Sequence, residues 1–161
     1  MEAKKIINLT DSRLTLFMFI GPEGSGKHDF ANELIQYSKS GTEIVSTNDI
    51  RKDICGNIYD QTKNKEVFSC VYKNIADKLD DKHDVIYVST NCRLQYRKKI
   101  IDICKHKYDR LIGIVFSRNL INCIEHNPGV DISQIEDNYV ELRKRPPHPF
   151  EGFDAIITCN E

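Results

Sequence analysis

Residues 14–28 read LTLFMFIGPEGSGKH, an apolar run of strand length that leads into a glycine-rich turn. The run 14–20 is almost entirely apolar, as expected for a strand that is buried on both faces of a parallel sheet. The residues after the turn, 27–39, have a helical pattern. A strand, a glycine-rich turn and a helix in this order predict a phosphate-binding loop.

The turn itself has the Walker A spacing, Gly21-x-x-x-x-Gly26-Lys27. Glycines let the backbone curl so that successive N–H groups point at phosphate oxygens, and the following helix adds the positive end of its dipole. Lys27 is placed to neutralise the β- and γ-phosphates of a nucleotide. The predicted nucleotide-binding residues of this segment are Gly21, Gly24, Ser25, Gly26, Lys27 and His28.

His28 stands where the Walker A motif normally has serine or threonine. The hydroxyl of that residue binds magnesium, a hard cation that prefers oxygen ligands. An imidazole suits softer transition metals, so His28 argues against a tightly held magnesium ion. The sequence leaves two roles open for His28: a position released from metal binding, or a side chain that contacts phosphate when protonated.

The composition predicts one soluble, intracellular domain. The 161 residues suffice for a proper core, and 24 acidic residues nearly balance 23 basic ones, so no overall positive charge favours nucleic acid. The six cysteines are never spaced as Cys-x-x-Cys, which predicts neither a zinc site nor a disulfide framework. The polar N-terminus is unlike a signal peptide, and no apolar run is long enough to span a membrane.

Strand and helix patterns alternate along the rest of the chain. Further strands are predicted at 42–47, 84–90, 111–117 and 153–158, and helices at 48–55, 62–80, 92–106 and 131–145. This alternation predicts an α/β fold with a parallel sheet covered by helices on both faces. We expect one domain over residues 14–161, with residues 1–13 forming a tail, an added edge strand or an assembly element. The stretches 123–133 and 144–152 bracket the last helix as a candidate lid.

Four segments, taken in order along the chain, indicate a more specific similarity to a known protein family. They are GPEGSGK (21–27), VSTNDIRKDICG (45–56), VIYVSTNCRLQYRKKI (85–100) and RKRPPHPFEGFDAI (143–156). In their order and spacing the chain resembles the polynucleotide kinase branch of the small P-loop kinases over about residues 14–158. The resemblance implies a five-stranded parallel sheet with a lid over bound ATP, with Arg118 at the nucleotide and a nucleic-acid end at Arg51.

The second segment lacks the general base of that family. The family carries an aspartate three residues before the arginine, and this carboxylate takes the proton from the acceptor hydroxyl. Here that position is Asn48, ahead of Arg51, and a carboxamide orients a hydroxyl but cannot act as a general base. Adjacent residues of a strand point to opposite faces, so Asp49 can replace the base only if a bulge or a helical turn directs its side chain to the same side as Asn48. The candidate catalytic residues are Lys27, Asn48, Asp49 and Arg51.

The third segment and the lid also depart from the family. The family's strand carries an aspartate that helps to hold the hydrated metal, whereas residues 88–91 read VSTN. The family's lid has an arginine about one turn after an Arg-Asn pair. Arg118-Asn119 is present, but Asn122 stands in the turn that follows, without the charge that stabilises a transferred phosphoryl group. The basic cluster 92–99, which includes Tyr96, is either a nucleic-acid patch or, as is commoner, a helix with a charged solvent face.

Relative to the family, four catalytic groups are changed: the metal-binding hydroxyl, the general base, the aspartate near the metal and the lid arginine. Three functions are compatible with these changes. The first is a nucleotide-binding relative of polynucleotide kinase with impaired or lost phosphotransfer, a pseudoenzyme. The second is an active ATP-dependent kinase for a nucleic-acid 5′-hydroxyl or a small nucleoside-like acceptor, in which Asp49 replaces the base and one of the basic residues 143–145 replaces the lid arginine. The third is a scaffold that binds no nucleotide. The convergence of the four changes favours the first.

Overall fold

A computed structural model describes residues 2–7, 12–127 and 129–160 of the chain. The strands are β1 (Thr15–Ile20), β2 (Glu43–Ser46), β3 (Val85–Val88), β4 (Arg110–Phe116) and β5 (Ala155–Cys159). The helices are α1 (Glu2–Ile7), α2 (Lys27–Tyr37), α3 (Thr47–Cys55), α4 (Asn64–Asp80), α5 (Leu94–Cys104), α6 (Leu120–Glu125), α7 (Ile132–Lys144) and the short 3-10 helix η1 (Pro149–Glu151).

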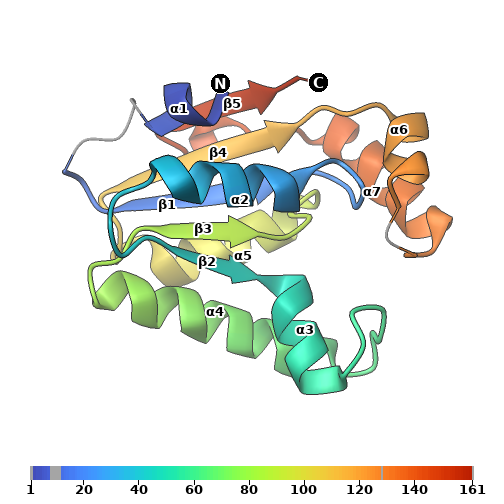
Figure 1. Cartoon of the computed structure of the whole chain (residues 1–161), viewed down its shortest axis with the longest axis horizontal. Helices are drawn as coiled ribbons and strands as arrows, with labels where there is room; N and C mark the ends of the chain where they lie inside the picture. The colour runs from blue at the N-terminus through green and yellow to red at the C-terminus, as the bar shows by residue number, and fades with distance from the viewer. Residues whose placement is uncertain (1, 8–11, 128, 161) are drawn as a thin grey trace.

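The strands form one parallel sheet in the order β2-β3-β1-β4-β5 (Figure 1). The central strand β1 pairs with β3 on one side and with β4 on the other, so that Leu16 lies opposite Val85 and Leu111. Parallel neighbours need crossover connections, which here are helices on both faces. The α/β fold with a five-stranded parallel sheet is therefore confirmed.

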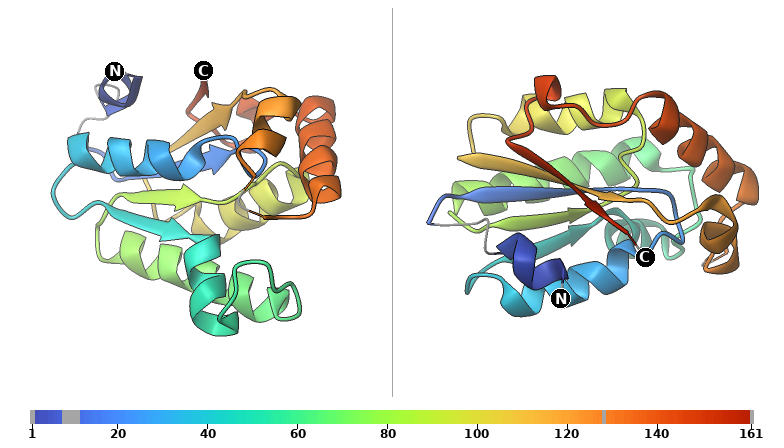
Figure 2. Two further views of the ribbon diagram at one scale, coloured as in Figure 1. Left: turned by 45° about the vertical axis from the view of Figure 1, so that its right-hand side comes forward. Right: turned by 90° about the horizontal axis from the view of Figure 1, so that it is seen from above.

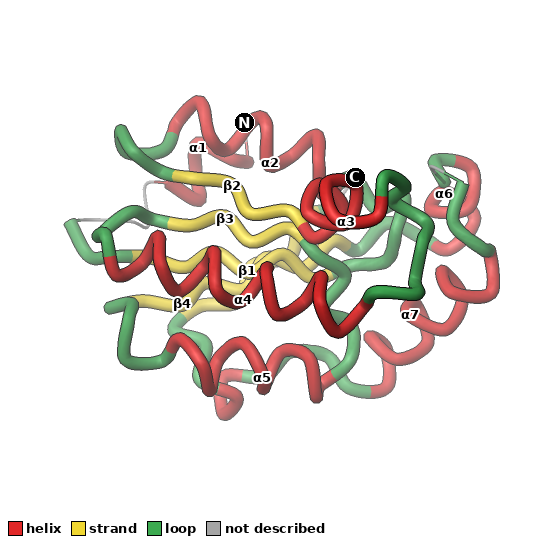
Figure 3. Tube along the Cα trace, turned by 90° about the horizontal axis from the view of Figure 1, so that it is seen from below, coloured by secondary structure: helices red, strands yellow, loops and turns green. Residues whose placement is uncertain are grey.

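The strand β1 shows why the sheet carries a separate core on each face. Leu16, Met18 and Ile20 belong to the core shared with α4 and α5, whereas Phe17 and Phe19 belong to the core shared with α1 and α2. Successive side chains of a strand point to opposite faces, so a run without polar residues buries both sides. Figure 2 and Figure 3 show α1 and α2 on one face of the sheet and α4 and α5 on the other.

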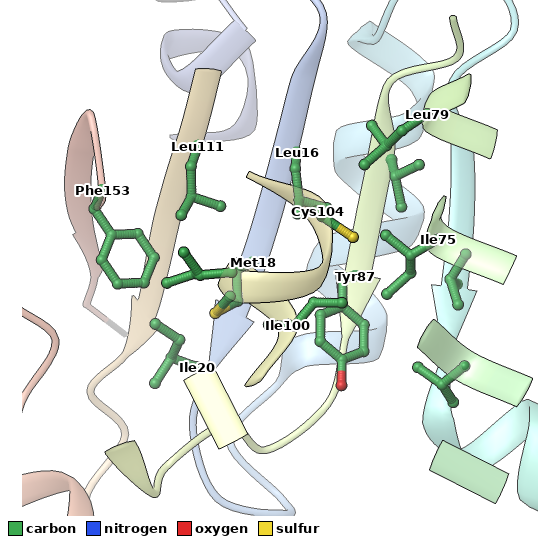
Figure 4. Packing of buried hydrophobic residues seen from close by; sticks show 14 of the residues in the cluster. Leu16, Met18, Ile20, Ile75, Leu79, Tyr87, Ile100, Cys104, Leu111 and Phe153 are labelled. Atoms are coloured by element: carbon green, nitrogen blue, oxygen red, sulfur yellow. The ribbon is translucent and has the colours of Figure 1, made fainter. Parts of the chain in front are cut away.

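The core beneath α4 follows the helical spacing seen in the sequence. The fully buried residues of this helix recur at intervals of one turn and are Val67, Val71, Ile75 and Leu79. Figure 4 shows Ile75 and Leu79 in the same cluster as Tyr87 of β3. Full burial of one such aliphatic side chain contributes about 1.5–3 kcal/mol relative to exposure, so α4 is fixed firmly against the sheet.

Three short helical segments lie outside the predicted elements. In α1, Ala3 and Ile6 are buried in the core shared with α2, so this part of the N-terminal segment is a helix and not an added edge strand. Met1 and residues 8–11 lie outside the described residues. α6 and η1 fall in or beside the two stretches predicted as lid loops.

All six cysteines are free thiols, and four of them are buried. Burial raises the pKa of the Cys92 thiol to about 12, so this side chain stays protonated near neutral pH. None of the helices in the described ranges is long and apolar enough to cross a membrane.

Candidate functional site

The loop between β1 and α2, residues 21–26 (the glycine loop), curls around the amino group of Lys27. Nζ of Lys27 donates hydrogen bonds to the carbonyl oxygens of Gly21 at 2.9 Å and of Pro22 at 2.6 Å, and the residue is 3 % exposed. Gly24 has a φ of 76°, a left-handed conformation that glycine adopts without steric cost. The glycine loop is therefore curled, with the amino group of Lys27 turned inward.

The segment after β3 supports this loop. The N–H of Gly21 donates to the carbonyl oxygen of Thr90 at 2.8 Å, and Nδ2 of Asn91 donates to the carbonyl oxygen of Phe19 at 2.9 Å. Asn91 is 2 % exposed and has a φ of 48°, a left-handed conformation in which asparagine is enriched. The Thr-Asn pair thus has a structural role that sequence reasoning did not assign to it.

Helix α6 packs directly on the glycine loop. A Cβ atom added at Gly24 would lie 2.1 Å from the carbonyl oxygen of Cys123, so α6 leaves no room for a side chain there. Just ahead of α6, Nη1 of Arg118 donates to the carbonyl oxygen of Gly24 at 2.8 Å, and the guanidinium lies beside Gly26. The structure places Arg118 against the glycine loop, and its contact with a nucleotide stays a prediction.

His28 and Asn48 meet beside the glycine loop. Nε2 of His28 lies 3.5 Å from Nδ2 of Asn48, and both side chains line the cleft that Lys27 also lines. Asn48 lies in the first turn of α3. The helical turn that the Asp49 alternative requires is therefore present, but Asp49 is exposed and is not among the residues that line the cleft. The carboxamide, rather than the carboxylate, reaches the candidate site.

Arg51 is a buried cation of the same cleft, with 4 % of its surface exposed. Nη1 donates to the carbonyl oxygen of Asp60 at 3.1 Å and to Oδ1 of Asn64. Cζ lies 6.0 Å from the ring centroid of Phe68, within the range of a cation–π contact. Arg51 thereby joins α3 to the α3–α4 connection and to α4.

These groups line one cleft of about 430 Å³, a volume within the range of small-molecule binding sites. Figure 1 shows α3, α6 and α7 beyond the carboxyl ends of the strands, where open α/β sheets bind their ligands. Four of the predicted residues line the cleft: Lys27, His28, Asn48 and Arg51. Three aromatic side chains also line the cleft: Tyr59 and Phe68, which sequence reasoning missed, and Tyr96, which it noted only within the basic cluster 92–99.

The segment that begins α7 lines the cleft with acidic and amide side chains. The lining residues are Asp131, Gln134, Asp137 and Asn138, and no basic residue of α7, all of which is described, is among them. Hydrogen bonds from the N–H and hydroxyl of Ser133 lower the pKa of Asp131, so its carboxyl group is ionised at neutral pH. Arg143 is exposed and donates to the hydroxyl of Tyr139 at 3.0 Å.

Arg97 is fully buried, so the prediction that the basic cluster 92–99 lies on a solvent face is wrong for this residue. Its Nε donates to Oε1 of Glu151 at 2.7 Å. Its Nη atoms donate to three carbonyl oxygens, those of Asn91, Cys92 and Arg145. The side chain therefore ties α5 to the segment after β3 and to the segment after α7, while Lys98 and Lys99 are exposed as predicted.

The corner of the cleft beside Lys27 lacks the hydroxyl through which a P-loop kinase holds magnesium, and the oxygen donors of the cleft come from other residues, such as Thr47, Ser89 and Asp131. An imidazole and a carboxamide occupy the corner beside Lys27, and magnesium binds preferably to oxygen in octahedral geometry. Across the described ranges, no group of three or more His, Cys, Asp and Glu side chains is arranged to hold a metal ion.

Residues 16–122 match the family model described as AAA domain. No curated protein matches the chain in sequence. Among solved structures, a chain of the Pnkp1/Rnl/Hen1 RNA repair complex is similar with a TM-score of 0.72 at 19% sequence identity, over 85% of this chain and 46% of that chain. The protein thus spans less than half the length of that relative.

Two small-molecule kinases are similar over nearly their whole length. APS kinase from Mycobacterium tuberculosis, solved with AMPPNP and APS, has a TM-score of 0.63 at 15% identity, over 92% of this chain and 90% of that chain. Shikimate kinase from Acinetobacter baumannii, solved with shikimate, has a TM-score of 0.57 at 15% identity, over 99% of this chain and 88% of that chain. Because the family model covers more than half of the sequence, the chain belongs to the AAA-domain family, and its fold is that of the P-loop kinases.

Proposed function

We propose that the chain is a polynucleotide kinase-like protein that binds ATP at the glycine loop and has impaired or lost phosphotransfer. The observation that carries the proposal is the pair of side chains, His28 and Asn48, that lines the cleft together with Lys27. The glycine loop and Lys27 keep the groups that bind phosphate. His28 replaces the metal-binding hydroxyl and Asn48 replaces the general base, so binding is retained while the chemistry loses two of its requirements.

The lid side of the cleft supports the same proposal. Asp131 and Asp137 line it, and carboxylates disfavour the negative charge that develops on a transferred phosphoryl group. The residues that the active-kinase alternative assigns as base and lid cation, Asp49 and one of residues 143–145, do not line the cleft. Arg51 does line the cleft, and the family resemblance assigns a nucleic-acid end to this residue as the alternative second ligand.

ATP affinity is expected to be almost independent of magnesium. Without a hydroxyl at position 28, the bound phosphates gain little from a metal ion, and the dissociation constant measured by calorimetry should change by less than about twofold between magnesium and EDTA. In EDTA, Lys27→Ala should weaken ATP at least about tenfold, because a buried charged hydrogen-bond donor to phosphate is removed.

Two results would contradict this expectation in different ways. Strong dependence on magnesium would show that the chain rebuilds a metal site, and active phosphotransfer would then become the better account. Absence of ATP binding in both buffers, with native and Lys27→Ala proteins alike, would leave a scaffold that binds no nucleotide. The variant His28→Ser provides the matched control, because restoring the hydroxyl should make ATP binding tighter in magnesium than in EDTA.

A further inference from the structure

Three aromatic side chains line the part of the cleft formed by the α3–α4 connection, α4 and α5, and the proposed nucleotide-binding role of the glycine loop does not use them. They are Tyr59, Phe68 and Tyr96, here called the ring subsite. The rings of Phe68 and Tyr96 are parallel within 2°, with centroids 6.0 Å apart. Offset parallel rings attract one another, so a planar ligand can extend this stack.

Arg51 holds the stack in position. Its Cζ lies 6.0 Å from the centroid of Phe68, and its Nη1 is hydrogen-bonded to the carbonyl oxygen of Asp60 and to Asn64. The guanidinium thus acts as a structural link between α3 and α4, with one of its nitrogens already bonded within the chain. Tyr96 remains 43 % exposed, and this ring offers the surface on which a ligand ring can lie.

A contact between two connections limits the size of the ligand. A Cβ atom added at Gly129 would lie 3.0 Å from Oη of Tyr59, so the α6–α7 connection rests against this ring. Both residues line the cleft, and their contact bridges its α3 side and its lid side. A bridged cleft suits a compact ligand better than a strand that must pass through it.

The charges around the ring subsite nearly cancel. Arg51 and Arg93 line the cleft together with Asp131 and Asp137, and Arg93 lies 3.8 Å from a carboxylate oxygen of Glu141. Sites for single-stranded nucleic acid combine stacking rings with a clear excess of lysine and arginine for the phosphates. The rings are present here without that excess, which favours a neutral ligand over a nucleic-acid strand.

We propose that the ring subsite binds one neutral, planar-ring ligand of nucleoside size, next to the ATP held by the glycine loop. The ligand ring extends the stack of Phe68 and Tyr96, and its hydroxyl or amino groups meet the acidic and amide side chains that begin α7. The proposal rests on the proposed nucleotide-binding function, because it assigns the second ligand of the same cleft.

Titration of the labelled protein with thymidine or adenosine, followed by NMR in EDTA with saturating ATP, tests this inference. We expect saturable binding of one nucleoside, and no binding of ribose, which lacks the aromatic ring. Tyr96→Ala should weaken the nucleoside about tenfold, as expected for loss of one stacking ring. Tyr37→Ala is the matched control: Tyr37 is 45 % exposed on α2, does not line the cleft, and its loss should leave nucleoside binding unchanged.

Two results would overturn the inference directly: no nucleoside binding, or equal losses of nucleoside affinity in Tyr96→Ala and Tyr37→Ala. Displacement of the nucleoside by ATP would also overturn it, because the base of ATP would then occupy the ring subsite. A 5′-hydroxyl oligothymidylate that binds far more tightly than thymidine, with a steep salt dependence, would assign the subsite to nucleic acid instead. ATP binding is measured in the same samples. Its loss with the nucleoside still bound would reject the proposed function and leave the ring subsite in place.

Discussion

Arg97→Met is expected to lower the free energy of unfolding by about 3–5 kcal/mol, the usual cost of removing one partner of a buried ion pair. The side chain is fully buried and donates to Glu151 and to three backbone carbonyl oxygens. Methionine fills much of the volume but donates no hydrogen bond. Glu151, whose side chain is 14 % exposed, then keeps its charge without its cationic partner.

Urea unfolding of the variant measures this loss, with Lys98→Met as the control. Lys98 follows Arg97 on α5 and is exposed, and lysine and methionine have similar helix propensities, so the control should stay within about 0.5 kcal/mol of the native protein. A loss of less than about 1 kcal/mol for Arg97→Met would contradict the structural role assigned to this arginine.

Gly24→Ala is expected to cost about 2–4 kcal/mol of stability, because two penalties combine. The residue has a φ of 76°, which disfavours any side chain, and the new Cβ would lie 2.1 Å from the carbonyl oxygen of Cys123. The atom in the way belongs to the backbone of α6 and cannot rotate aside as the end of a flexible side chain can. The variant therefore forces α6 away from the glycine loop.

Gly56→Ala separates the two penalties. Gly56 ends α3 with a φ of 75°, almost the same value, but a Cβ atom there would meet nothing within 4 Å. Thermal or urea unfolding should therefore give a loss of about 1–2 kcal/mol for Gly56→Ala, from conformation alone. Equal losses for the two variants would show that α6 does not pack on the glycine loop in solution.

The strands could be predicted because burial on both faces leaves a simple pattern. In β1, five consecutive residues from Leu16 to Ile20 are fully buried, and each of the other predicted strands is likewise found within two residues of its expected start. The short helix α6 was missed because its segment reads as part of a polar loop. Its available signal is Asn119, whose side chain accepts the N–H of Asn122 as an N-cap.

The candidate site could be predicted only where its residues are close in sequence. The glycine loop with Lys27 is a contiguous motif, and the family resemblance pointed to Asn48 and Arg51. All three side chains line one cleft, and their roles there stay predictions. The burial of Arg97 depends on Glu151, which lies 54 residues away. The ring subsite likewise draws Tyr59, Phe68 and Tyr96 from separate elements, and no local pattern reports such long-range contacts.

Phosphate transfer from γ-labelled ATP tests the central claim of lost phosphotransfer most directly. The assay uses magnesium and then manganese, with 5′-hydroxyl DNA, 5′-hydroxyl RNA and a nucleoside as acceptors, beside a Lys27→Ala blank. We expect no product above the blank, because Asn48 cannot take a proton and His28 does not hold the metal. Product that forms with the native protein and disappears in the blank would contradict the account, and Asp49→Asn would then test the remaining candidate base.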